Sequence, residues 1–147
     1  MSNLNFPPGY QQKIEKILDA KFSGNELNFS FGEYNNTAEA RLLLKKINLI
    51  KRQLSLVKQE ANQEIKNIRA SYQSEMEKIS ESGGAFTQLF FGKNAGGRKR
   101  QMERNALKEK RDNTLLPYEN VKSAIDQLNL EIDNVKLRIE MNIANNK

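Results

Sequence analysis

The sequence contains no cysteine and no histidine. The lack of cysteine excludes disulfides, zinc–thiolate sites and thiol nucleophiles. The lack of histidine removes the commonest general base and metal ligand. Any catalysis would fall to carboxylates, lysine, serine or tyrosine in a concave pocket, and no phosphate-binding glycine loop ends in Lys-Ser/Thr. We therefore predict a protein that is not an enzyme and that has no cofactor, metal site or small-molecule substrate.

Apolar residues are scarce as well. Only 37% of the 147 residues are hydrophobic, and the mean hydropathy is −0.75. This composition fits either a disordered chain or an elongated helical protein with a narrow apolar seam. No stretch approaches the roughly 20 apolar residues of a membrane span, and no apolar run typical of a signal peptide is found. The expected location is the cytoplasm.

Glycine and proline are absent from Thr37 to Ser80, and this range is predicted to be the first long helix. Asn36 and Glu39 have the spacing of a capping box, which starts a helix. The apolar residues then recur at alternating intervals of three and four, as in a heptad seam: Leu43, Ile47, Ile50, Leu54, Val57 and Ala61. Beyond Ala61 the seam continues with stutters as far as Ile79.

A second long helix is predicted over residues 98–142. Its C-terminal half has strict heptad spacing, with Tyr118, Val121, Ile125, Leu128, Ile132, Val135 and Ile139. Pro117 lies between its halves, and a proline inside a helix costs about 3 kcal/mol, so we predict a kink or interruption within a turn of it. Two such helices joined by a turn indicate an antiparallel hairpin. With Leu43 opposite Ile139, the basic start of the first helix faces the acidic end of the second.

Residues 1–36 are predicted to be a separate small module, with residues 37–147 forming the hairpin. The module combines an amphipathic helix over 11–22 with an extended segment over 27–33, in which Leu27, Phe29 and Phe31 alternate with polar residues. The predicted fold class is therefore all-α: a long antiparallel coiled-coil helical hairpin with a small N-terminal helix and extended module packed at its base.

Six leucines lie outside the heptad seam near the base of the hairpin: Leu42, Leu44, Leu49, Leu56, Leu130 and Leu137. The N-terminal module could cover them and form a three-helix base. Alternatively, a second subunit could pack there and form a four-helix bundle. A homo-oligomer is therefore among the expected partners.

Between the helices lies a predicted tip, residues 83–97, bracketed by Gly83-Gly84 and Gly96-Gly97. It carries four large apolar residues: Phe86, Leu89, Phe90 and Phe91. They could fold back as a small plug, or form an exposed patch that marks a partner or membrane site. The flanking glycines would let such a plug hinge.

Positive charge is concentrated beside this tip. Net charge is +6, and residues 83–111 hold eight basic and two acidic residues, so the rest of the chain sums to zero. The basic residues of this stretch that lie on the second helix are Arg98, Lys99, Arg100, Arg104, Lys108, Lys110 and Arg111. Acidic residues of the facing helix offset part of this charge, which could leave an ordinary solvated surface. A remaining local excess attracts phosphates and other anions.

These features predict a non-enzymatic binding or scaffolding protein that presents an apolar, basic tip to an acidic partner surface. The expected contact residues are the four apolar tip residues together with Arg98, Lys99, Arg100 and Arg104. An alternative is nucleic-acid binding through residues 98–111, with Lys108, Lys110 and Arg111 added, although no familiar nucleic-acid-binding motif is present. A third is binding to an anionic membrane surface through the tip.

Overall fold

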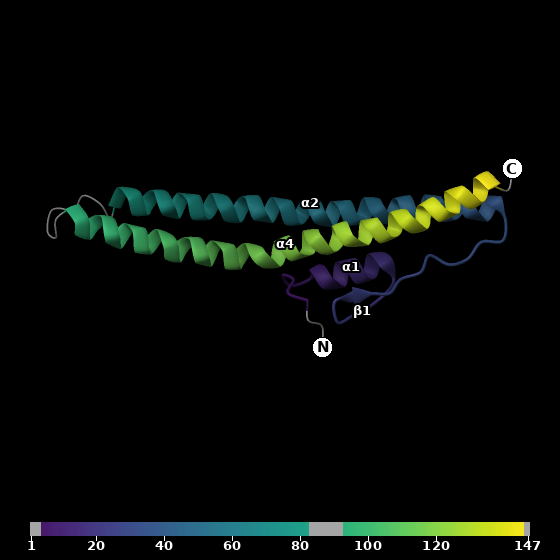
Figure 1. Cartoon of the computed structure of the whole chain (residues 1–147), viewed down its shortest axis with the longest axis horizontal. Coiled ribbons are helices and arrows are strands. Elements are labelled where there is room, and N and C mark those ends of the chain that lie inside the picture. Colours follow the sequence, from purple (N-terminus) through teal and green to yellow (C-terminus); the bar gives the residue numbers. More distant parts are fainter. Residues whose placement is uncertain (1–3, 83–92, 146–147) are drawn as a thin grey trace. The chain divides into compact units, whose positions relative to one another are not determined.

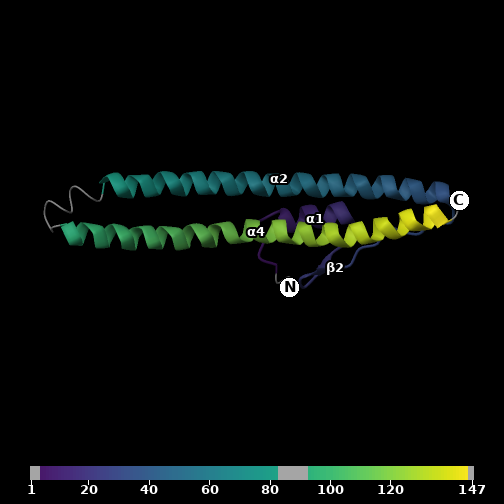
Figure 2. The same ribbon diagram turned by 45° about the horizontal axis from the view of Figure 1, so that its top comes forward.

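The computed structural model describes residues 4–82 and 93–145, with side chains over 4–79 and 98–145. The elements follow in the order α1 (Tyr10–Leu18), β1 (Phe22–Ser23), β2 (Glu26–Leu27), α2 (Thr37–Ser82) and α4 (Lys93–Asn145) (Figure 1). The helices α2 and α4 lie side by side in both ribbon views (Figures 1 and 2). They pack against each other as a helical hairpin, which confirms the predicted fold class.

The chain divides into two compact units, and each contains part of α2 and part of α4. Residues 1–61 and 119–147 form one unit, and residues 62–118 form the other. We name them the core unit and the cationic unit, respectively. The N-terminal module belongs to the core unit together with the first half of α2 and the last part of α4.

Helix α2 begins with the predicted capping box. The Asn36 side-chain oxygen accepts a hydrogen bond from the Glu39 backbone N–H at 2.8 Å. The Glu39 carboxylate in turn accepts one from the backbone N–H of Asn35, also at 2.8 Å. The return bond therefore comes from the residue before Asn36, whereas the usual box uses the N-cap residue itself. Two N–H groups that the helix leaves without backbone partners are satisfied in this way.

Replacing Asn36 with alanine is expected to lower the free energy of unfolding by about 1 kcal/mol, because the Glu39 N–H loses its acceptor. Urea denaturation followed by circular dichroism would measure this difference. Asn35→Ala is the matched control, since Asn35 contributes its backbone and not its side chain to the cap. Equal losses in the two variants would contradict this role of the Asn36 side chain.

The core unit buries seventeen apolar side chains. They come from α1 (Tyr10, Ile14, Leu18), the following segment (Leu27, Phe31), α2 (Ala40, Leu43, Ile47, Ile50, Leu54, Val57, Ala61) and α4 (Val121, Ile125, Leu128, Ile132, Ile139). The seam positions expected from the heptad spacing are all among the buried residues of α2. Helix α1 adds the third side of this core, so the base contains three helices.

Polar contacts connect the N-terminal module to both long helices within the core unit. Lys13 of α1 forms an ion pair with Glu60 of α2 at 2.8 Å. The side-chain amide of Asn120 donates a hydrogen bond to the Asn5 backbone oxygen at 3.1 Å. The hydrogen bond with Glu60 raises the pKa of Lys13. Both side chains are about half exposed, so the pair contributes little. Because the pKa of Lys13 is raised, the contribution of this lysine is present at neutral pH and is lost as the pH rises through that pKa.

The N-terminal helix is shorter than predicted. It ends at Leu18 because Asp19 adopts the left-handed conformation, with φ 49°. Phe22, which was predicted to lie on this helix, instead belongs to β1 and pairs with Leu27 of β2 in an antiparallel two-stranded hairpin. The predicted extended segment 27–33 contributes only Leu27 to a strand. A tertiary contact explains the position of Phe22, because its ring packs edge-on against that of Phe6, with 6.0 Å between the ring centroids.

Helix α4 differs from its prediction at two places. It begins at Lys93 instead of residue 98, so Gly96 and Gly97 lie inside its first turns and do not bracket a turn. It also continues through Pro117, so the predicted interruption is wrong. Proline removes one backbone hydrogen bond, and the residue four positions before it, Asn113, is exposed to solvent, where water can satisfy the freed carbonyl. The kink stays a prediction.

Ion pairs define the antiparallel register of α2 and α4 in the core unit. Lys51 pairs with Asp133, and Lys58 pairs with Asp126 at 2.6 Å. The two lysines are one heptad apart, and so are the two aspartates in the opposite direction. This register agrees with the predicted alignment of a basic stretch of α2 with acidic residues of α4. Glu60 of α2, by contrast, pairs with Lys13 of the N-terminal module and not with α4.

The side-chain oxygen of Asn129 is buried in the core unit without a hydrogen-bond partner among the described residues. Asn129→Leu replaces the amide with an apolar group of similar shape and should raise the free energy of unfolding by about 1 kcal/mol. Thermal and urea denaturation would measure the gain. Asn48→Leu, at an exposed position of α2, should change stability by less than about 0.5 kcal/mol. Destabilisation by Asn129→Leu would show that this amide has a structural partner.

Candidate binding surface

The predicted site includes four tip residues that lie outside the described part of the chain: Phe86, Leu89, Phe90 and Phe91. Their role as apolar anchors stays a prediction. The described portion of the predicted site is the stretch of α4 from Arg98 to Arg111, within the cationic unit.

The structure separates the seven basic residues of this stretch into two groups. Four are exposed, namely Arg98, Lys99, Lys108 and Lys110. Within the described ranges 4–79 and 98–145, none of these four forms an ion pair. The other three, Arg100, Arg104 and Arg111, are half-buried.

The half-buried arginines occupy seam positions of α4. Apart from Pro117, the less exposed residues of α4 in the cationic unit recur at intervals of three and four: Arg100, Arg104, Leu107, Arg111, Leu115 and Tyr118. The long aliphatic stem of arginine can cover apolar surface while its guanidinium group stays at the rim. Arg111, for example, reaches the Asp112 carboxylate at 3.2 Å. The exposed group is therefore the part of the predicted site that is most accessible to a ligand.

Arginine at these positions leaves the cationic unit with a thin core. Among its described side chains only Ile65 and Leu115 are buried. Ile68, Tyr72, Met76 and Ile79 of α2 are half-buried. A hydrogen bond of 3.2 Å joins the hydroxyls of Tyr72 and Thr114 across the two helices. This unit is held together by far less apolar burial than the core unit.

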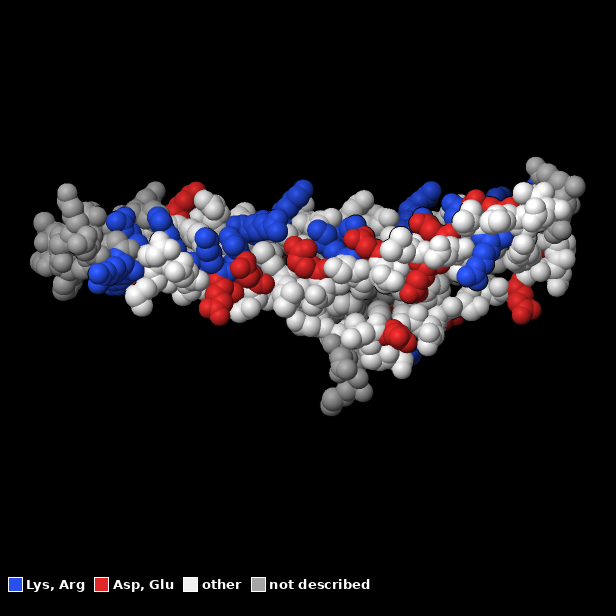
Figure 3. All heavy atoms as spheres, in the orientation of Figure 1, with Lys and Arg blue, Asp and Glu red and all other residues white. Residues whose placement is uncertain are grey.

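Acidic and basic residues are equally numerous in the facing part of α2 over residues 62–79. Over residues 62–79, three acidic residues (Glu64, Glu75, Glu77) are matched by three basic ones (Lys66, Arg69, Lys78). Over 98–118, seven basic residues stand against three acidic ones. Lys and Arg atoms accordingly crowd this part of the hairpin in the space-filling view (Figure 3). Within these two ranges, positive charge thus exceeds negative charge by four, and the predicted partial neutralisation stays a prediction.

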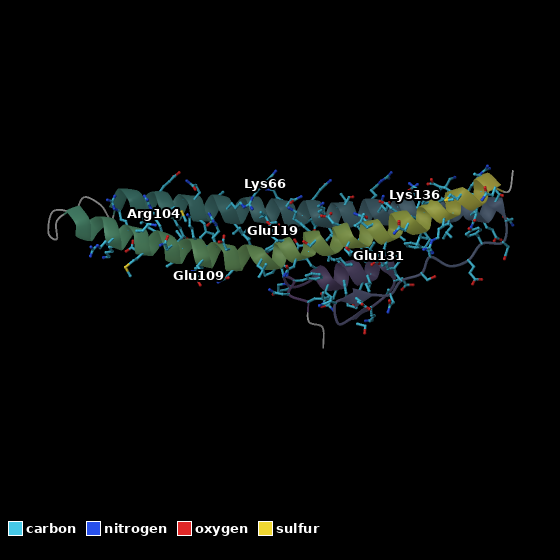
Figure 4. The ribbon with its side chains drawn as sticks, viewed as in Figure 1. Lys66, Arg104, Glu109, Glu119, Glu131 and Lys136 are labelled. Carbon is cyan, nitrogen blue, oxygen red and sulfur yellow. The ribbon has the colours of Figure 1, made fainter. Side chains whose placement is uncertain are left out.

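Sequence reasoning missed the contribution of α2 to this surface. Lys66 and Arg69 are both exposed, and they belong to the same unit as the basic stretch of α4 (Lys66 and Arg104 are labelled in Figure 4). Their spacing of three residues on one helix was the available signal. Acidic residues on the same helix obscured this signal, and one of them, Glu60, pairs with Lys13 of the N-terminal module.

The core unit has several surface hollows. One, of about 300 Å³, is lined by Phe29, Phe31, Tyr34, Leu43, Arg138 and Ile139 among others. It is mainly apolar and brings no acid–base pair together. No cluster of three or more potential metal ligands occurs within residues 4–79 and 98–145. No helix in the described part of the chain combines the length and apolar character needed to cross a bilayer.

The chain thus forms a helical hairpin with two units. The core unit is well packed, and the cationic unit has little apolar burial and an excess of basic residues in its described part. The chain matches no protein-family model, no curated protein and no solved structure. Its function must therefore be inferred from its own surface.

Proposed function

We propose that this chain is a non-enzymatic binding protein that uses the α4 stretch 98–111 to hold an acidic partner surface. The observation that supports this most directly is the group of four exposed cations without ion-pair partners in the described ranges: Arg98, Lys99, Lys108 and Lys110. An unpaired cation can bind an incoming carboxylate without first breaking an internal ion pair. The half-buried Arg100, Arg104 and Arg111 add to the local potential.

The tip residues Phe86, Leu89, Phe90 and Phe91 complete this proposal as apolar anchors. Interfaces draw most of their binding energy from a few buried aromatic or arginine anchors, while surrounding charges speed association and select the partner. The order along the chain places the apolar residues directly before the cations. The proposed partner is an acidic protein surface, and the proposed location is the cytoplasm.

One observation favours nucleic acid as a second candidate. The exposed cations extend from Arg98 to Lys110, which corresponds to roughly 18 Å of helix. Duplex DNA carries one charge per roughly 1.7 Å of its axis, so this length would face several phosphates. Sequence-specific contacts are not implied, because a row of lysine and arginine binds phosphates without reading bases.

Fluorescence anisotropy with three labelled probes would test these proposals: a poly-glutamate peptide, a DNA duplex, and vesicles containing phosphatidylserine. If the acidic-protein proposal holds, the wild-type chain binds the peptide, and Arg98→Ser/Lys99→Ser/Lys108→Ser/Lys110→Ser weakens binding at least tenfold, by the measured coupling of close charge pairs. If nucleic acid is the ligand, duplex binding dominates and its logarithm falls with the logarithm of salt with a slope of about −3 to −4.

The matched control removes the same number of charges from the core unit, through Lys16→Ser/Lys21→Ser/Arg41→Ser/Arg138→Ser, all at exposed positions. Both variants lower the net charge equally, so only a local binding surface predicts different results for them. Equal weakening in both, or no binding to any of the three probes, would refute the proposed role of the 98–111 stretch. Binding to vesicles alone would assign the surface to membranes instead.

A further inference from the structure

The core unit retains a set of large apolar side chains on its outside. Leu42, Leu49 and Leu56 of α2, and Leu130, Leu137 and Met141 of α4, are between 53% and 64% exposed. The predicted coverage of these leucines by the N-terminal module is therefore wrong: α1 packs on the seam and leaves them open. Leu44, the sixth leucine of the predicted set, is half-buried.

The exposed leucines form two stripes. Leu42, Leu49 and Leu56 are separated by one heptad each, so they line one side of α2 over roughly 21 Å. Leu130 and Leu137 are likewise one heptad apart on α4, and Met141 follows one turn later. Neither stripe coincides with the buried seam of its own helix, whose residues include Ile47, Leu54, Ile125 and Ile132. Single exposed leucines are ordinary, whereas a heptad stripe has the spacing of a helix–helix contact.

The two stripes are flanked by opposite charges. Residues three or four positions from the α2 leucines include Lys45, Lys46 and Arg52, and these positions adjoin a residue on a helix surface. None of the three forms an ion pair within the described residues 4–79 and 98–145. Glu39 and Glu60 lie at the same spacing from the first and last leucine, and Glu60 pairs with Lys13. The α2 stripe is therefore an apolar line whose border is basic along its middle and acidic at its two ends.

The α4 stripe has an acidic border. Asp126, Asp133 and Glu140 lie three or four positions from Leu130 or Leu137. Asp126 and Asp133 pair with lysines of α2, yet their side chains remain 57% and 51% exposed. Glu140 is 3.9 Å from Lys136 and also about half exposed. Part of each acidic side chain therefore remains accessible and can contact a second cation.

We propose that a second copy of this chain covers these stripes, with the α2 stripe of one copy packed on the α4 stripe of the next. Leucines one heptad apart on both faces can align, and the basic border then meets the acidic one. Pairing like stripes would instead oppose lysine with lysine or aspartate with aspartate, which disfavours those arrangements. Because unlike faces meet, the contact is heterologous, and a pair of copies joined by one contact still has one free stripe of each kind for further association or ring closure.

This surface lies within the core unit and is independent of the binding surface proposed for residues 98–111. Sedimentation velocity over about a hundredfold range of protein concentration would reveal the association, since mass action makes it concentration-dependent. Three proteins are compared: the wild-type chain, an α2-stripe variant (Leu42→Gln/Leu49→Gln/Leu56→Gln) and an α4-stripe variant (Leu130→Gln/Leu137→Gln). All five substituted positions are exposed, and circular dichroism verifies that both variants stay helical.

The wild-type chain is expected to form species larger than a monomer, and each variant alone is expected to be monomeric. An equal mixture of the two variants should form a dimer and stop there, because only one intact stripe of each kind remains. Lys45→Glu/Arg52→Glu should weaken wild-type association by about tenfold or more, through like charges at the contact. A monomeric wild-type chain, self-association of either variant alone, or no association in the mixture would each overturn the proposal.

Discussion

Leu54→Ala is expected to lower the free energy of unfolding by about 2–5 kcal/mol, the range observed for removing a fully buried leucine. Leu54 has no exposed surface and lies in the middle of the α2 seam, between Ile50 and Val57. The substitution removes the apolar contacts of the side chain and leaves a cavity that surrounding helices can fill only in part. Urea denaturation followed by circular dichroism would measure the change in midpoint.

Leu49→Ala is the matched control for this substitution. It makes the same chemical change five residues earlier on α2, but Leu49 is 53% exposed. At the lowest protein concentration that the signal allows, where association is minimal, the loss should be less than about 0.5 kcal/mol. A loss at Leu49 as large as that at Leu54 would contradict the placement of the core.

Amide hydrogen exchange is expected to be much faster in the cationic unit than in the core unit. The core unit buries seventeen apolar side chains, and the described part of the cationic unit buries two. Local opening costs less where little apolar surface must be exposed. A difference of only about 3 kcal/mol between the two opening free energies corresponds to roughly a hundredfold difference in exchange rate.

Mass spectrometry of peptides from residues 40–61 and 121–139 on one hand, and 62–79 and 98–118 on the other, would measure this difference. Helical hydrogen bonding continues through both units in α2 and α4, so secondary structure alone predicts equal protection. Uniform exchange along the two helices would show that the hairpin opens as one cooperative structure. If the proposed function is correct, saturation with the anionic ligand should slow exchange in the cationic unit most.

The weak packing of the cationic unit follows from residues placed where a stable seam would have leucine or isoleucine. Arg100, Arg104 and Arg111 stand at positions equivalent to the seam residues of the core unit. Each guanidinium group resists full burial, so the helices there cannot exclude water as they do around Ile47 and Ile125. The same residues thus lower local stability and supply positive charge.

Local pattern was sufficient to predict the helices. The heptad spacing from Leu43 to Ala61 and from Tyr118 to Ile139, and the Asn36–Glu39 cap, depend on residues within one or two turns of each other. Because the spacing of three and four residues applies only to a helix, the sequence by itself determined the hairpin and most of its buried residues. Composition alone also located the positive charge in residues 83–111.

The tertiary structure determined which neighbours each surface side chain contacts. Phe22 lies in a strand and not in the predicted helix, because it pairs with Leu27 and packs against Phe6 in the folded module. Glu60 pairs with Lys13, which is 47 residues away in the sequence. Leu42 and Leu49 remain exposed because α1 packs on the seam beside them, which the periodicity of α2 does not reveal. A residue's spacing determines its side of a helix, whereas its neighbours across the fold determine whether that side is covered.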